Sequence, residues 1–178
     1  MKKEIKVLDY ANQITNALKG GVLLTTKYND KVDSMAIGYG MIGKIWDGEY
    51  FIVYVREGRY TRELLDQSKE FTVNIPYGQY DRKIIGYCGS RSGKDIDKLK
   101  DLNLTLVEGE TVSAPAIKEL PLTLECEVKY QQLMDSTEIP EYIRNKEYPQ
   151  GVPSSNTGCN QDYHIAYYGK ITKAYIIE

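Results

Sequence analysis

Hydrophobic and polar positions alternate along much of this chain with the two-residue period of β-strands. The apolar positions of these segments are rich in β-branched and aromatic residues, which favour pleated, half-buried structure. Turn residues or prolines bound most of the segments, as expected for short strands joined by tight connections. The predicted strands are 22–27, 32–40, 42–46, 50–56, 71–75, 104–107, 122–134 and 163–177.

Helical spacing is confined to short segments between these strands. Residues 9–18 place Ala11, Ile14 and Leu18 on one face, and the glycine pair at 20–21 predicts the end of that helix. Residues 61–68 predict a second helix, with Thr61 as its cap. Residues 135–161 contain three prolines and little periodicity, so they are predicted to form a long loop.

The order of these elements predicts a mainly β protein, an antiparallel barrel with short peripheral helices. Turn signals at Asn29-Asp30 and Asp47-Gly48 favour hairpins, and no βαβ alternation is present. Gly169 marks a bulge or bend in the last strand. With 178 residues and no linker or repeat, the chain is expected to form a single domain over 1–178.

Composition and charge narrow the possible functions. Charged residues make up 27% of the chain and the net charge is −2, which disfavours nucleic acid and anionic membranes as partners. The charged start, MKKEIKVLDY, lacks the apolar core of a signal peptide, so a cytoplasmic location is expected. Cys88, Cys126 and Cys159 form no CxxC pair and are expected to be reduced. Cys159 and His164 alone supply too few ligands for a metal site.

Residues 84–102 carry the first candidate site. Gly86, Gly89 and Gly93 permit close approach of the backbone, and two hydroxyls and two cations follow within residues 90–94. The stretch then enters a predicted helix with Ile96, Leu99 and Leu102 on one face, and Asp95 in its first turn. Such an arrangement favours an anion-binding loop. The alternative is a surface loop followed by a capped helix.

A second basic cluster lies at Arg56, Arg59 and Arg62, where a predicted strand passes through Gly58 into a helix. Arg56 and Arg59 present guanidinium groups suited to a phosphate. The alternative is a solvated turn in which Arg62 pairs with Asp66 at i,i+4. Two such clusters in a chain with net charge −2 favour a phosphorylated ligand.

Other short motifs do not carry a function. Residues 38–43 spell GxGxxG but continue into a predicted strand, whereas the dinucleotide fingerprint opens a helix. Gly93-Lys94 lacks both the first glycine and the hydroxyl residue of a P-loop. A nucleophilic triad would have to use His164, the only histidine, and no GxSxG is present. His164 is alternatively a surface or interface histidine hydrogen-bonded to a tyrosine.

Taken in order, several segments resemble the flavin reductase-like family, whose fold is the FMN-binding split barrel, and its flavoredoxin-type branch in particular. Lys94 stands where arginine is usual, and Glu57-Gly58 replaces a Pro-Ser pair. The segments that carry the resemblance are DSMAIGYG at 33–40, VREGRYT at 55–61, EFTVNIP at 70–76, CGSRSGKDIDK at 88–98, DYH at 162–164 and GKI at 169–171.

The resemblance implies FMN as cofactor and NADH or NADPH as co-substrate. It places the flavin phosphate between two basic loops, the isoalloxazine along one strand, and His164 near the face where nicotinamide docks. The residues implied to bind the cofactor are Ser34, Met35, Ala36, Arg56, Arg59, Tyr60, Thr61, Asn74, Cys88, Gly89, Ser92, Gly93, Lys94 and Lys98.

The resulting hypothesis is an FMN-dependent oxidoreductase that passes hydride from a nicotinamide to flavin and then to an acceptor. The resemblance also implies a homodimer, and an electron-transfer partner protein is possible. Two alternatives stay open. The first is a non-catalytic flavin carrier or store, and the second is a barrel that has lost flavin and serves as an interaction module.

Overall fold

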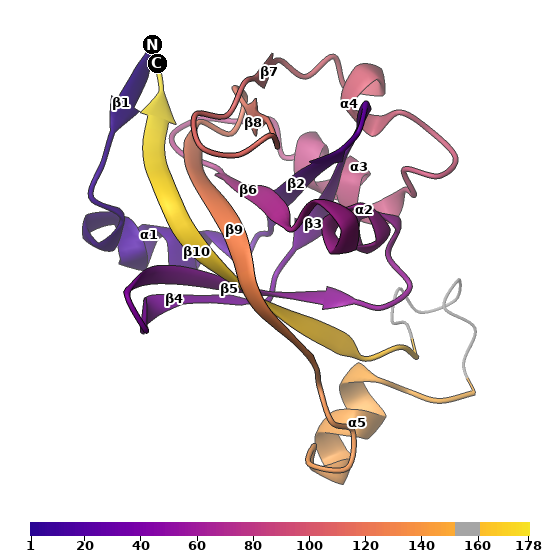
Figure 1. The fold of residues 1–178 in the computed structure, drawn as a ribbon. Coiled ribbons are helices and arrows are strands. Elements are labelled where there is room, and N and C mark those ends of the chain that lie inside the picture. Colours follow the sequence, from indigo (N-terminus) through magenta and orange to yellow (C-terminus); the bar gives the residue numbers. More distant parts are fainter. Residues whose placement is uncertain (152–160) are drawn as a thin grey trace.

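An eight-stranded antiparallel sheet forms the centre of the computed structural model, which describes residues 1–151 and 161–178 (Figure 1). Along the sheet the strands follow the order β3-β2-β6-β9-β10-β5-β4, with β1 paired to β10. The strands are β1 (Lys2–Glu4), β2 (Val22–Tyr28), β3 (Lys31–Ile37), β4 (Gly40–Ile45), β5 (Gly48–Arg56), β6 (Glu70–Ile75), β9 (Leu122–Leu133) and β10 (His164–Ile177).

The order of strands makes the sheet an open, or split, barrel. Its two ends are β3 and β4, which residues 38–39 join directly, so the sheet curls back on itself without closing. The predicted mainly β, antiparallel architecture is therefore confirmed. A separate pair, β7 (Leu106–Val107) with β8 (Ala116–Ile117), lies beside it.

Short helices occupy the connections. They are η1 (Val7–Tyr10), α1 (Ala11–Ala17), α2 (Tyr60–Ser68), α3 (Lys83–Ser90), α4 (Lys98–Asp101) and α5 (Glu141–Glu147). The helices predicted at 9–18 and 61–68 are confirmed, the first with an initial 3-10 turn. No helix in the described part of the chain has both the length and the apolar character needed to span a bilayer.

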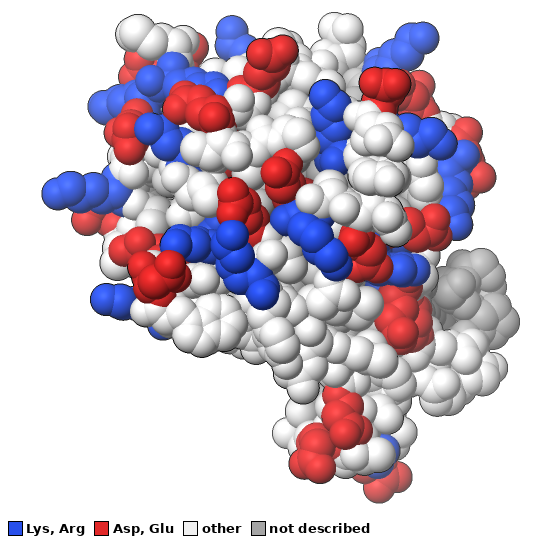
Figure 2. Space-filling view, in the orientation of Figure 1, with Lys and Arg blue, Asp and Glu red and all other residues white. Residues whose placement is uncertain are grey.

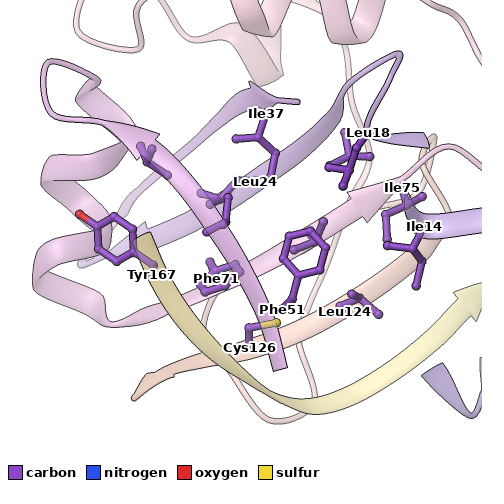
Figure 3. Close-up of a cluster of buried hydrophobic side chains, with 14 of the residues drawn as sticks. Ile14, Leu18, Leu24, Ile37, Phe51, Phe71, Ile75, Leu124, Cys126 and Tyr167 are labelled. Atoms are coloured by element: carbon purple, nitrogen blue, oxygen red, sulfur yellow. The ribbon is translucent and has the colours of Figure 1, made fainter. Parts of the chain in front are cut away.

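The core lies inside the curled sheet, where apolar side chains from both halves meet (Figure 3). Phe51, Phe71 and Leu124 are fully buried there, as is Tyr167, whose hydroxyl donates to Asp66 at 2.7 Å. A Cβ at Gly169 would lie 2.4 Å from Cζ of Phe71, so only glycine fits. The predicted irregularity at Gly169 is confirmed by a register shift between β9 and β10.

Three sequence predictions need correction. Residues 83–90, expected to begin a loop, form α3, because Ile84, Ile85 and Cys88 bury one helical face against β2 and β3. The helix expected to begin near Asp95 is one turn that begins at Lys98, since the Asp97 side chain accepts from the N–H of Lys100 and caps it.

The third correction concerns 135–161, predicted to be a long loop. Residues 141–147 form α5, which starts directly after Pro140, a residue well suited to a helix start. Residues 152–160, including Pro153 and Cys159, lie outside the described residues. In Figure 1, α5 stands apart from the barrel where β9 and β10 run out beyond it.

Candidate functional site

Two adjoining cavities lie where β3, the start of α2 and the loop after α3 converge. The first, here the loop cavity, has a volume of about 220 Å³, and the second, here the histidine cavity, about 200 Å³. Met35, Ala36 and Arg59 line both, so the two are continuous. Pockets for small ligands typically occupy roughly 300–1,000 Å³, so a nucleotide-sized ligand would need both cavities.

The loop cavity gathers both basic loops found in the sequence. Arg59 and Tyr60 begin α2, while Gly89 to Gly93 close the opposite side. Its lining residues are Asp33, Met35, Ala36, Gly58, Arg59, Tyr60, Thr61, Cys88, Gly89, Ser90, Arg91, Ser92, Gly93 and Lys98.

Arg59 is the cation at the junction of the two cavities. Its side chain is partly buried, and its guanidinium forms no hydrogen bond or ion pair with any described residue. Burial lowers the pKa of Arg59, although the guanidinium stays charged at neutral pH. A partly desolvated cation that has no hydrogen bond or ion pair within the described part of the chain is costly, so this position is suited to an anionic ligand.

A buried ion pair forms the floor of the loop cavity. Lys98 Nζ lies 3.0 Å from Asp33 Oδ1 and also donates to the carbonyl of Ser34, while the Thr61 hydroxyl donates to Asp33 Oδ2 at 2.5 Å. The Asp33 carboxylate is thus neutralised and fully engaged. Lys98, implied above as a cofactor ligand, has its charge committed to Asp33.

Gly93 packs directly on this carboxylate. A Cβ at Gly93 would lie 2.3 Å from Asp33 Oδ1, a distance that neither residue can relieve without moving the loop. On the other wall, Cys88 is buried, and burial raises the pKa of its thiol to about 11. Cys88 is therefore protonated at neutral pH and packs as an apolar group.

The histidine cavity contains the only histidine of the chain. Its lining residues are Met35, Ala36, Ile37, Gly38, Tyr39, Tyr54, Arg56, Arg59 and His164. Burial, with help from Arg56 and Arg59, lowers the pKa of His164 to about 4. The tyrosine hydrogen bond of the alternative noted from the sequence is observed, since His164 Nδ1 lies 2.7 Å from the hydroxyl of Tyr148, but the histidine is buried rather than at the surface.

Arg56 differs from Arg59 in its surroundings. Its two terminal nitrogens donate to the carbonyls of Asp162 and Glu147, each at 2.9 Å. Arg62 forms the i,i+4 ion pair with Asp66 foreseen as the alternative, at 2.8 Å. Of the three arginines in this cluster, Arg59 is therefore the one whose guanidinium is not held by the described protein.

Three of the residues named from the sequence lie outside both cavities. The Asn74 amide is fully buried, donating to Thr25 and Thr72 and accepting from the N–H of Ile117. The Ser34 hydroxyl is bonded to Thr25 at 2.7 Å. Lys94 pairs with Glu63 at 2.7 Å on the outer side of the loop.

The remaining predicted residues line one cavity or both, and the structure adds several that sequence reasoning did not select. Asp33 lies in the motif at 33–40, directly before Ser34, and this position is the sequence signal that could have identified it as a site residue. Tyr39 lies in the same motif but was not selected, whereas Tyr54 and Tyr148 had no signal, because sixteen tyrosines are spread over the chain.

Comparison with known proteins gives a consistent result. The family model described as flavin reductase like domain matches residues 18–177. An uncharacterized protein of Archaeoglobus fulgidus is 38% identical over 76 residues, which are 43% of this chain and 42% of that protein. The match thus spans about two-fifths of the length of that curated relative.

Solved structures share the fold. Flavoredoxin from Methanosarcina acetivorans is 26% identical and has a TM-score of 0.63, covering 89% of this chain and 68% of its own. Nitrilotriacetate monooxygenase component B from Bacillus cereus has a TM-score of 0.67 at 15% identity, covering 98% of this chain and 78% of its own, which shows the fold alone.

Proposed function

This chain belongs to the flavin reductase-like family, and we propose that it is an FMN-dependent oxidoreductase that accepts hydride from NADH or NADPH. The observation that carries the proposal is the Arg59 guanidinium, which forms no hydrogen bond or ion pair with a described residue and lies at the junction of two adjoining cavities whose combined size suits a nucleotide. In this assignment the phosphate occupies the loop cavity and the ring system extends toward the histidine cavity.

The residues around the loop cavity fit a phosphate monoester. Arg59 supplies a charge-assisted donor, and Ser92 adds a hydroxyl on the facing loop. Gly89 and Gly93 keep that loop close to β3, since a Cβ at either would contact Ala36 or Asp33. The Asp33 carboxylate does not oppose the phosphate, because Lys98 and Thr61 neutralise and occupy it.

The protein's own contribution to the reaction is binding, orientation and exclusion of water. Bound FMN would supply the two-electron redox chemistry. Met35 and Ala36 border both cavities and offer an apolar strand surface for a flat ring. His164 lines the histidine cavity, where its uncharged imidazole is available to a second planar ligand.

Anaerobic stopped-flow reduction tests this proposal. FMN-loaded protein mixed with NADH or NADPH should lose its flavin absorbance in a saturable, single-turnover reaction faster than free FMN does. Reduction by dithionite but by neither nicotinamide would overturn the enzyme assignment. That outcome would favour the second candidate, a flavin carrier. The 26% identity to a flavoredoxin is the observation that supports this candidate.

A homodimer is part of the proposal. Aromatic rings form a connected surface from the turn between β4 and β5 across β10 to β9, because the exposed rings of Trp46 and Tyr130 both contact Tyr168. In Figure 2 the neck between the barrel and α5 is largely free of charge, whereas charges of both signs cover the barrel. Such a surface fits a second copy, and Trp46→Lys should shift the mass by light scattering from dimer to monomer.

A further inference from the structure

We propose that Tyr148 is a positioning residue that fixes His164 as an imidazole carrying its proton on Nε2, ready to donate to a carbonyl oxygen in the histidine cavity. The assignment of that carbonyl to a nicotinamide carboxamide rests on the proposed function. The hydrogen bond itself rests only on this structure: the Tyr148 hydroxyl and His164 Nδ1 are 2.7 Å apart, and both side chains are buried.

Tyr148 is held firmly from both faces. Its ring stacks on Tyr163 at 4.6 Å and 28°, and the guanidinium carbon of Arg56 lies 5.0 Å from its centroid. Arg56 is itself bonded to the carbonyls of Glu147 and Asp162, the residues that precede Tyr148 and Tyr163. The phenol therefore cannot turn away from the imidazole without disrupting these contacts.

The direction of the hydrogen bond follows from the acceptors that the phenol can reach. Among the described residues they are His164 Nδ1 at 2.7 Å and the thioether sulfur of Met134 at 3.7 Å. An imidazole nitrogen accepts far better than a thioether, so the phenol proton points at Nδ1. A neutral imidazole that accepts at Nδ1 carries its own proton on Nε2.

The surroundings keep the imidazole neutral. Arg56 from β5 and Arg59 at the start of α2 oppose a positive charge, while Asp162 and Glu147 favour one. Burial is the largest cause and acts in the same direction as the arginines, so the net result is a pKa for His164 of about 4. Tyr39, whose ring centroid is 5.2 Å from the imidazole, covers one side of it.

The remaining ring nitrogen is the one open to a ligand. Nδ1 is engaged by Tyr148, and His164 lines the histidine cavity, so Nε2–H is its available polar group there. An uncharged donor beside tyrosine rings suits a flat molecule with an exocyclic carbonyl oxygen. A cationic imidazole would instead repel the positively charged ring of an oxidised nicotinamide.

Nitrogen NMR tests the tautomer directly, because the chain has one histidine and its ring signals need only to be assigned to Nδ1 and Nε2, from their couplings to the ring carbon-bound protons. In flavin-free protein labelled with 15N-histidine at pH 7, the Nε2 shift should be that of a protonated nitrogen and the Nδ1 shift that of an unprotonated one. Tyr148→Phe keeps the ring but removes the hydroxyl, and should give a mixture of tautomers. The Tyr163 ring stacks on Tyr148 but does not contact Nδ1, so Tyr163→Phe should leave the nitrogen shifts unchanged.

Two results would overturn the proposal. One is a wild-type protein protonated on Nδ1, and the other is a Tyr148→Phe variant whose tautomer is unchanged.

The assignment of the carbonyl to a nicotinamide is tested separately. Tyr148→Phe should raise the nicotinamide concentration needed for half-saturation roughly fivefold to tenfold, while the affinity for FMN stays within about twofold of wild type. An unchanged nicotinamide dependence would refute that assignment. If wild-type flavin is not reduced at all, the proposed function fails while the NMR result still decides the role of Tyr148.

Discussion

The Asp33 carboxylate and the Lys98 ammonium lie 3.0 Å apart, and both side chains are buried beneath the loop cavity. The pair joins β3 to α4, and Thr61 attaches the start of α2 to the same carboxylate. Three elements far apart in sequence are thus fixed by one charged group. Gly93 rests on that group, so the shape of the loop cavity depends on it.

Removing one member of this pair should be strongly destabilising. Lys98→Met leaves a buried, uncompensated carboxylate, which typically costs about 3–5 kcal/mol. Adding Asp33→Asn should recover part of this loss, because the uncompensated charge is gone. Urea denaturation measures both, and Lys100→Met on the exposed side of α4 is the matched control. A double variant no more stable than Lys98→Met would contradict the pairing argument.

The backbone approach at Gly93 gives a prediction specific to binding. Gly93→Ala places a methyl group against Asp33, which cannot yield because Lys98 and Thr61 hold it, so the loop must move outward and FMN affinity should fall. Gly86→Ala in α3 meets nothing within 4 Å and should stabilise the helix by about 0.5–1 kcal/mol. Fluorescence titration with FMN compares the two, and equal affinities would refute the role of Gly93.

Arg59 should contribute to FMN affinity through the phosphate alone. Arg59→Ala removes one charge-assisted contact, worth about 1.5–3 kcal/mol or roughly 10- to 150-fold in the dissociation constant. Riboflavin, which lacks the phosphate, should bind the variant about as well as it binds the wild type. Arg82→Ala removes the same charge from an exposed position outside both cavities and is the control. FMN affinity within twofold of wild type in Arg59→Ala would place the phosphate elsewhere.

The sequence predicted the strands well because each carries its own signal. Alternation in 50–56 and 122–134 is a local property, and Gly169 marked a register shift at a position where the packing of Phe71 leaves no room for a Cβ. The two basic clusters were also visible, and both border the loop cavity.

Other features depend on contacts that no local pattern records. Gly86 and Gly89 lower helix propensity, so α3 resembled a loop, although its apolar residues pack on β2 and β3. Helix α5 buries none of its residues and therefore has no amphipathic pattern. Tyr148 reaches the candidate site only because the C-terminal end of α5 lies beside Arg56 of β5 and His164 of β10, which explains why sequence reasoning did not select it.

The pKa of His164 makes stability depend on pH in a definite direction. In the unfolded chain an imidazole titrates near 6.5, whereas burial and two arginines hold the folded value at about 4. Between these values the unfolded state binds a proton that the folded state does not, so the free energy of unfolding falls as pH drops from 6.5 to 4. The loss of stability approaches about 3 kcal/mol when the pKa shift is fully formed.

Carboxylates titrate over the lower part of the same pH range, so denaturation of the wild type must be compared with that of His164→Gln at each pH. The stability difference between the two proteins should be constant above pH 7 and should change steadily below 6.5 in favour of the variant. A difference independent of pH over this range would show that His164 titrates alike in both states, and that its burial beside Arg56 does not keep it neutral.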